Sequence, residues 1–174
     1  KSLAEVDGEV DVACIAIPAR FVFNAVEDCA AKGVRYLPII TSGFSEVGNT
    51  EGERQIVSYA REHGMGVLGS NIFGIYSAQV SLDATFGPGN IMAGNVAIIT
   101  QSGALGIAMI GKTAIENIGL SAIVSVGNKS DVDEADLLTY LTEHDGTKVI
   151  MMYIEGIKEG EKFIKALKQA TQQK

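Results

Sequence analysis

The turn Gln101-Ser102-Gly103-Ala104 combines residue types that suit the binding of an anion. It follows the apolar run from Val96 to Thr100 and precedes a stretch of helical character. The first N–H groups of a helix have no partner within the helix, and the helix dipole is positive there, so such a turn attracts anions. Ser102 could cap the helix or turn its hydroxyl to a bound phosphate. A capped turn without a ligand is the competing interpretation.

Glu155 is a second candidate for chemistry, because it directly follows the apolar run VIMMYI and should emerge at the end of a strand. A carboxylate at that place could orient a histidine or raise its basicity. The alternative is an exposed glutamate that merely ends a strand.

Nucleophilic catalysis by Ser102 is disfavoured by its neighbours. A nucleophile elbow requires the pattern G-x-S-x-G, and here Thr100 and Ala104 occupy the two flanking positions. Neither histidine is an obvious base for this serine. His63 stands in the last turn of an expected helix and His144 lies in the polar loop EHDG, so we expect a surface role for both.

The sequence contains no recognisable metal-ligand spacing, since the patterns CxxC, HxH and HExxH are all missing. The acidic run between residues 131 and 136 lacks the central glycine and terminal glutamate of a calcium-binding loop. We interpret it as the acidic start of a helix, which the helix dipole favours.

Strands and helices alternate along the chain. The expected strands cover residues 11–19, 36–40, 66–68, 96–100, 121–128 and 148–156, and the expected helices cover residues 21–32, 51–63, 102–117, 134–143 and 158–169. This alternation with short loops predicts an α/β fold of two consecutive parallel-sheet units. We expect a first domain at residues 1–78, a connector at 79–94 and a second domain at 95–174.

The loops after the expected strands contain many Gly, Ser, Thr and Asn residues and few Lys or Arg residues. Ligands of open α/β sheets bind outside the carboxyl ends of the strands. Loops of this composition favour the binding of an anion by backbone and hydroxyl groups over charge pairing. The pattern therefore predicts a phosphate-bearing ligand, although strand-end loops are small and polar in many proteins without one.

The composition narrows the class of protein. The 174 residues carry a net charge of −7 and are 47% hydrophobic, which disfavours a nucleic-acid-binding surface. No apolar run has the length of a membrane span, and no signal-peptide pattern is present. Cys14 and Cys29 lie in apolar stretches, so we expect two buried thiols in a reducing, cytoplasmic environment.

Six stretches together resemble the NDP-forming acyl-CoA synthetases, the family of the succinyl-CoA synthetase α-subunit and the ADP-forming acetyl-CoA synthetases. These stretches are AIPARFV, TSGFSEVG, VLGSNIFG, ITQSGALG, VSVGNKSDVDEADLLTYL and TKVIMMYIEGIKEGEKFI. The resemblance implies the rear part of a Rossmann-like CoA-binding domain followed by a flavodoxin-like domain. It also implies a reaction that interconverts acyl-CoA, phosphate and ADP or GDP with the free acid, CoA and ATP or GTP. In this family an acyl phosphate forms first, and its phosphoryl group then moves to a histidine and on to the nucleotide.

The resemblance also implies roles for individual residues. Ser102, Gly103 and Ala104 correspond to the turn that holds the phosphoryl group, and Glu155 to the carboxylate that contacts the catalytic histidine. The loops similar to those that line the CoA site contain Pro18, Thr41, Ser42 and Asn71.

This sequence departs from the family pattern in one loop and lacks several of the family's parts. Ser70 replaces the proline of the family's LGPN loop, a change that bears on the rigidity of that loop. The Gly-rich pyrophosphate loop, the catalytic histidine loop and the nucleotide-binding ATP-grasp part, which uses Mg, are expected outside residues 1–174. We therefore expect a fragment that is inactive alone, with an ATP-grasp domain or β subunit as partner and an oligomeric full-length form. The alternatives are a non-catalytic CoA- or phosphate-binding regulatory module and a subunit that only docks to a partner.

Overall fold

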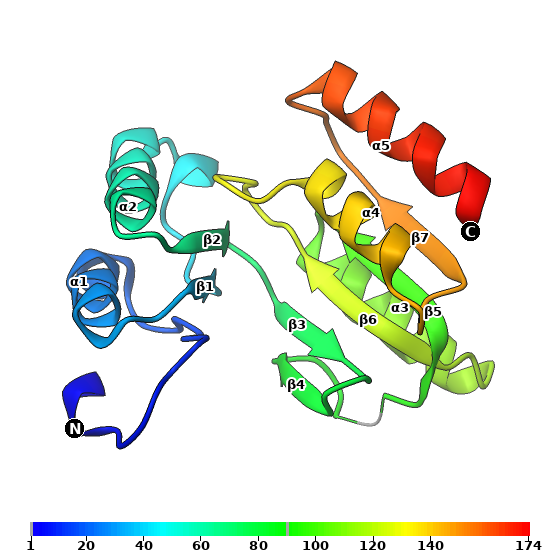
Figure 1. Ribbon diagram of the computed structural model, residues 1–174, viewed down its shortest axis with the longest axis horizontal. Helices are drawn as coiled ribbons and strands as arrows, with labels where there is room; N and C mark the ends of the chain where they lie inside the picture. The colour runs from blue at the N-terminus through cyan, green and yellow to red at the C-terminus, as the bar shows by residue number, and fades with distance from the viewer. Residues whose placement is uncertain (1, 90) are drawn as a thin grey trace. The chain divides into compact units, whose positions relative to one another are not determined.

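The computed structural model describes residues 2–89 and 91–174 and divides into two compact units (Figure 1). Lys1–Ile72 and Asn128–Val132 form the first unit, and Phe73–Gly127 and Asp133–Lys174 form the second. The domain boundaries expected from the sequence, at residues 78 and 95, stay predictions. Within the described part of the chain, every helix is too short or too polar to cross a membrane.

The first unit contains a pair of parallel strands and two α-helices. Its elements are η1 (Leu3–Glu5), η2 (Ala19–Phe21), α1 (Val22–Lys32), β1 (Tyr36–Ile39), η3 (Ser45–Val47), α2 (Thr50–Glu62) and β2 (Gly66–Gly69). β1 and β2 pair in parallel, with Tyr36 opposite Gly66. Helix α1 ends at Gly33, whose φ of 79° is left-handed, as expected for a glycine that stops a helix.

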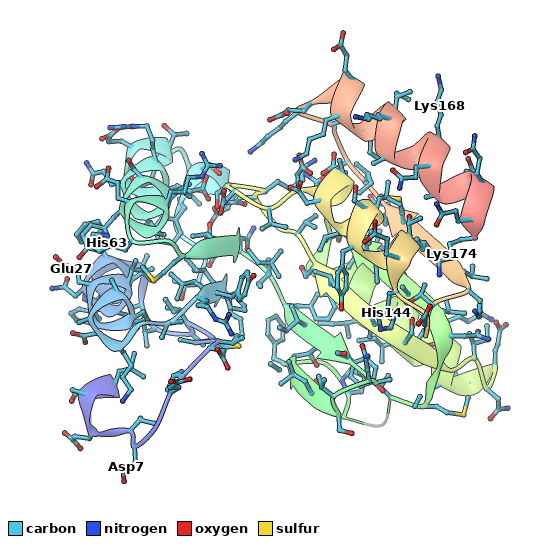
Figure 2. All side chains as sticks on the ribbon, in the orientation of Figure 1. Asp7, Glu27, His63, His144, Lys168 and Lys174 are labelled. Atoms are coloured by element: carbon cyan, nitrogen blue, oxygen red, sulfur yellow. The ribbon has the colours of Figure 1, made fainter. Side chains whose placement is uncertain are left out.

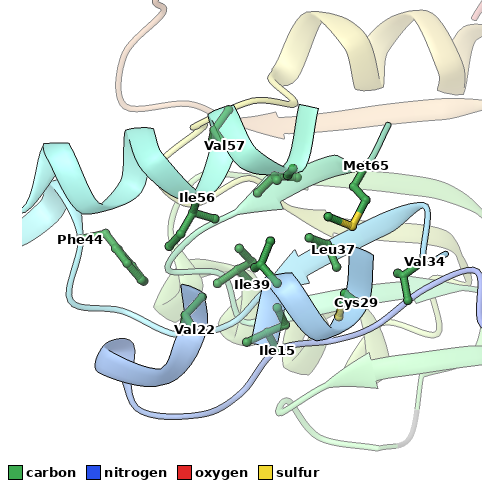
Figure 3. Close-up of a cluster of buried hydrophobic side chains, with 13 residues drawn as sticks. Ile15, Val22, Cys29, Val34, Leu37, Ile39, Phe44, Ile56, Val57 and Met65 are labelled. Carbon is green, nitrogen blue, oxygen red and sulfur yellow. The ribbon is translucent and has the colours of Figure 1, made fainter. Parts of the chain in front are cut away.

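The core of the first unit lies between its two α-helices and one face of the strand pair (Figure 3). The strands contribute alternate residues, since side chains of a strand point to opposite faces in turn. The buried side chains that meet there include Ile15, Val22, Val26, Leu37, Ile39, Ile56, Ala60 and Val67.

The prediction of a continuous strand at residues 11–19 is wrong in extent. The structure keeps only two isolated parallel bridges, from Val12 to Tyr36 and from Ile15 to Ile39. The expectation that both thiols are buried is also wrong, because Cys29 is buried but Cys14 is exposed. The alternation along this segment explains the difference, since it turns Ile15 into the core and Cys14 to the opposite face.

The second unit is built on a five-stranded mixed sheet. Its elements are β3 (Gly74–Ser77), β4 (Leu82–Thr85), β5 (Ala93–Thr100), α3 (Gly103–Ile115), β6 (Leu120–Ser125), α4 (Glu134–Glu143), β7 (Val149–Tyr153) and α5 (Gly160–Gln173). The strand order is β4-β3-β6-β5-β7, and β5 runs parallel to both β6 and β7. The α/β fold with parallel strands that the sequence predicted is confirmed.

Helices cover both faces of this sheet, so residues 97–100 of β5 are buried on both sides. Ala97 and Ile99 pack with residues of α4 and α5, whereas Ile98 packs with Ile110 of α3. This explains why the strand reads as a continuous apolar run. The carboxyl ends of β5, β6 and β7 lie at one edge of the sheet, as their parallel registers require (Figure 1).

The sequence did not predict the antiparallel hairpin of β3 and β4, which lies partly within the expected connector. β3 pairs antiparallel with both β4 and β6. The hairpin brings Gly74 against the backbone of β4, where a Cβ atom would lie 2.1 Å from the Ala84 carbonyl oxygen. Its φ of 126° also favours glycine. The short strands GIYS and LDAT have too few apolar residues to produce a periodic signal.

Candidate functional site

The turn between β5 and α3 is held by its own hydrogen bonds. Ser102 is the N-cap of α3, and its Oγ accepts a hydrogen bond of 3.3 Å from the Leu105 N–H group. The hydroxyl of the buried Thr100 donates to the Ser102 carbonyl over 2.8 Å and accepts from the Ser102 N–H group over 3.2 Å. Gly103 and Ala104 are the first two residues of the helix. Their N–H groups belong to the helix end that has no intrahelical partners, so they suit an anion.

Gly106 allows the first turn of α3 to lie close to the sheet. A Cβ atom at this position would lie 2.4 Å from the Phe73 ring and 2.9 Å from the Thr100 methyl group. Phe73 is fully buried, and its N–H group donates to the Ser125 hydroxyl over 3.3 Å. The close approach therefore sets the position of the helix N-terminus relative to the strand ends.

Gln101 connects this turn to the segment that follows β7. Its backbone N–H group donates to the Tyr153 carbonyl over 2.9 Å, which continues the pairing of β5 with β7. Its side-chain Oε1 accepts from the N–H groups of Glu155, at 2.9 Å, and Gly156, at 3.3 Å. Glu155 itself is exposed. The structure thus brings Glu155 and the Ser102 turn to the same edge of the sheet.

In the first unit, three loops meet at the carboxyl ends of β1 and β2. The half-buried Thr41 joins two of them, because its hydroxyl donates to the Ile17 carbonyl over 2.7 Å and accepts from the Ile17 N–H group over 3.2 Å. The Asn71 N–H group donates to the Thr41 carbonyl over 3.0 Å and brings in the third loop. Pro18 and Ser42 are exposed beside these contacts. All four residues expected at a CoA site therefore lie on neighbouring loops.

The loop with Ser70 is held by hydrogen bonds in place of a proline ring. Ser70 is buried, and its hydroxyl donates to Glu53 Oε1 over 2.7 Å. Its carbonyl accepts from the Asn128 N–H group over 2.9 Å. The Asn128 side-chain amide donates to Glu53 over 2.8 Å and to Glu46 over 2.6 Å. These contacts restrain the loop that carries Asn71.

Glu46 is held in its ionised form by its surroundings. Burial raises the pKa of its carboxyl group, but hydrogen bonds from the Gly43 N–H group and the Asn128 amide outweigh burial and leave the pKa below its ordinary value. The carboxylate therefore stays charged and continues to accept both hydrogen bonds at neutral pH.

The acidic run of residues 131–136 has two roles, and one of them corrects the sequence interpretation. Asp133 caps α4, and Asp136 completes the capping box, as expected for an acidic helix start. Asp131 instead lies in the first unit, where it accepts from the Val67 N–H group over 2.8 Å and pairs with Arg61. Within the described residues, no group of three or more His, Cys, Asp or Glu side chains could hold a metal ion.

Both histidines, labelled in Figure 2, make contacts within their own unit. The exposed His63 has Nδ1 2.8 Å from the Tyr59 carbonyl, and the expected surface role is confirmed. His144 is half-buried, and the surface role expected for it stays a prediction. Its Nδ1 lies 2.9 Å from the Thr147 hydroxyl and its Nε2 lies 2.8 Å from Gln79 Oε1. These contacts lie before the start of β7, at the opposite end of the strand from Glu155.

Comparison with known proteins gives matches along the whole chain. Residues 93–174 match the model of the succinyl-CoA ligase like flavodoxin domain. The chain is 49% identical over 177 residues to the α subunit of acetate–CoA ligase [ADP-forming] I from Pyrococcus furiosus, and the match covers 100% of this chain and 38% of the relative. It is also 40% identical to acetate–CoA ligase [ADP-forming] from Methanocaldococcus jannaschii, of which it covers 25%.

Comparison with solved structures also gives matches to synthetases of this kind. The acetyl-coenzyme A synthetase 1 of Ca. Korarchaeum cryptofilum, in complex with phosphate and ADP, matches with a TM-score of 0.97 and 48% identity. That match covers 99% of this chain and 38% of the solved chain. The sequence described here therefore spans less than half the length of the relatives it resembles.

Proposed function

The chain belongs to the NDP-forming acyl-CoA synthetases, as its sequence predicted, and from this premise we propose that it supplies the phosphoryl-holding turn and part of the CoA site of such an enzyme. The overall reaction converts acyl-CoA, phosphate and ADP or GDP into the free acid, CoA and ATP or GTP. The names of the relatives specify acetate and 4-hydroxybutyrate, so we propose a carboxylic acid as the class of substrate.

One observation supports this proposal above the others: Glu155 and the N-terminus of α3 meet at one edge of the sheet through Gln101. The N–H groups of Gly103 and Ala104 would donate to the phosphoryl oxygens, and the positive end of the helix dipole favours their negative charge. The Ser102 hydroxyl now accepts from Leu105, and its proton remains available for a phosphoryl oxygen.

Glu155 would accept a hydrogen bond from one imidazole nitrogen of the catalytic histidine. Such a bond holds the ring in the tautomer whose other nitrogen can receive the phosphoryl group. His144 does not fit this role, because both its nitrogens are engaged at the opposite end of β7. We place the phosphorylated histidine in the part of the enzyme that this chain does not span.

The first unit offers the surface that CoA requires. The hydroxyl of Thr41 is hydrogen-bonded to the neighbouring loop and restrains this surface. The side chains of Ser42 and Asn71 are exposed there as polar groups beside Pro18. Such a surface fits the amide-bearing arm of CoA, which alternates polar and apolar groups. Nucleotide and Mg would bind to an ATP-grasp domain or a β subunit, the partner we propose for this chain.

The substitution Ser102→Ala in the full-length enzyme tests the proposal. It removes the hydroxyl from the α3 N-terminus and should lower the amount of phosphohistidine formed from ATP and Mg by about tenfold, since a hydrogen bond to a charged group contributes roughly 1.5 kcal/mol. The control is Ser58→Ala, because Ser58 is exposed on α2. Unchanged phosphohistidine levels in Ser102→Ala would contradict the assignment. The isolated 174-residue chain should show no turnover of acyl-CoA with ADP and phosphate.

A further inference from the structure

The side chain of Gln101, at the end of β5, is hydrogen-bonded to the backbone of the loop that follows β7. A single amide oxygen accepts two successive N–H groups, at 2.9 Å from Glu155 and at 3.3 Å from Gly156. An amide oxygen has two lone pairs, so it can accept both bonds at once. The bond from the Gln101 N–H group to the Tyr153 carbonyl adds a third restraint two residues before Glu155.

The segment that Gln101 contacts lies at the surface, after the end of β7. Glu155 and Gly156 are exposed, and β7 has already ended at Tyr153. Glycine lacks a Cβ atom and samples more backbone conformations than any other residue. The hydrogen bond from the Glu155 N–H group to Gln101 restrains the Glu155 peptide, and thereby the position and direction from which the Glu155 side chain leaves the backbone.

We propose that Gln101 is a positioning residue that sets the direction of the Glu155 carboxylate relative to the Ser102 turn. The proposal rests on the proposed function, in which Glu155 contacts the catalytic histidine. Because Gln101 also directly precedes Ser102, one residue places the carboxylate and the phosphoryl-holding turn in a single geometry. Small errors of placement in such a constellation lower the rate of group transfer.

The chemistry of the contact explains why glutamine suits this place. Asparagine is one methylene shorter, and methionine matches the shape without a strong acceptor. Glutamate keeps the acceptor oxygens and hence both hydrogen bonds, but it introduces a negative charge next to a turn that should bind an anion. The two roles of Gln101 can therefore be separated by substitution.

The experiment compares Gln101→Met, Gln101→Glu and the control Gln172→Met in the full-length enzyme. Gln172 lies on the exposed surface of α5 in the same unit. Hydrogen exchange, read on peptides that cover residues 153–157, reports the two N–H groups without any need for activity. We expect exchange about fivefold faster in Gln101→Met, since a hydrogen bond contributes roughly 1 kcal/mol. Gln101→Glu should retain the slow exchange of the unmodified protein.

The second readout is the rate of phosphohistidine formation from ATP and Mg. Gln101→Met should lower this rate at least fivefold while the KM for CoA stays within twofold, because the proposed CoA loops belong to the first unit. Gln101→Glu should also form phosphohistidine slowly, because of its added negative charge, although its hydrogen exchange at residues 153–157 stays normal. Gln172→Met should match the unmodified enzyme in both readouts.

The outcomes separate this inference from the proposed function. Unchanged exchange in Gln101→Met overturns the contact, and faster exchange with an unchanged phosphorylation rate overturns the positioning role. The variant Glu155→Gln tests the proposed function on its own. If it forms phosphohistidine at the normal rate, Glu155 has no part in the reaction and the catalytic consequence of Gln101 falls with it, whatever the exchange data show.

Discussion

Replacement of Gly106 by alanine should destabilise the second unit, because the new methyl group has no space. The added Cβ atom would lie 2.4 Å and 2.9 Å from two atoms of the Phe73 ring and 2.9 Å from the Thr100 methyl group. The ring has little room to move, since Phe73 is fully buried and its ring centroid lies 6.2 Å from that of Phe86. The methyl group of Thr100 is attached directly to a buried strand.

The magnitude follows from two opposing effects. Overpacking of this kind costs about 1–3 kcal/mol, whereas alanine improves the helix by about 1 kcal/mol over glycine. With contacts this close we take the upper half of the overpacking range, so the net loss should be about 1–2 kcal/mol. For a protein of this size that corresponds to a fall of roughly 3–6 °C in Tm.

Gly111 provides a matched control on the same helix. No atom lies within 4 Å of the position that its Cβ would take, so Gly111→Ala should gain only the helix propensity of about 1 kcal/mol. The assay is thermal unfolding of both variants and the unmodified protein, followed by circular dichroism and calorimetry. A Tm for Gly106→Ala equal to or above that of the unmodified protein would refute the reasoning about the close approach of α3.

Three further predictions concern other contacts. Burial raises the pKa of the Asp133 carboxyl group, but the Lys162 ammonium outweighs burial and holds that pKa below its ordinary value. The pair therefore stabilises the folded protein above about pH 4, the pKa of Asp in the unfolded chain. This stabilisation is lost as the pH falls through the lower pKa of the folded state. Lys162→Met should lower the free energy of unfolding by about 0.5–1 kcal/mol at pH 7, because the pair is partly exposed. In urea unfolding at successively lower pH the difference between the variant and the unmodified protein should shrink, and a difference that stays constant below about pH 4 would contradict the assignment. Ser70→Ala removes the hydroxyl donor from the buried carboxylate of Glu53 and should cost about 1–2 kcal/mol in urea unfolding, and an unchanged midpoint would show that the contact contributes nothing. Thr41→Val removes the hydrogen bonds that join two loops of the first unit, so calorimetric titration of the full-length enzyme should show CoA binding several-fold more weakly. Phosphohistidine formation should stay normal, and an unchanged affinity for CoA would contradict the proposed site.

Local patterns were sufficient to predict those elements whose signals are local. The run from Val96 to Thr100 reads as a strand with both faces covered, and Ser102 reads as a helix cap; the structure confirms both. The helix at Glu134–Glu143 has the predicted bounds, because its acidic start and apolar spacing are both visible in the sequence. The glycine stop at Gly33 follows from the same kind of local reasoning.

Features that depend on partners distant in the chain could not be predicted in this way. The hairpin of β3 and β4 is stabilised by pairing with β6, more than 40 residues away, as in the pair Ile75 and Val124. The strand expected at residues 11–19 is reduced to two bridges, and the alternation there exposes Cys14. The return of Asp131 to the first unit, where it pairs with Arg61, has no signature within its acidic run.

Apolar periodicity, capping residues and short motifs are properties of neighbouring residues, so they were enough to predict the α/β class, the family and the residue types at the turn that we propose to hold phosphate. The contacts beside that turn depend on how distant strands pair. Gln101 reads as an ordinary polar residue until β5 and β7 pair, since its two hydrogen bonds reach a segment 54 residues further along the chain. Gly106 likewise becomes indispensable only when folding brings the ring of Phe73 against it. Contacts between distant segments depend on the register and packing of the whole unit, and no local pattern encodes them.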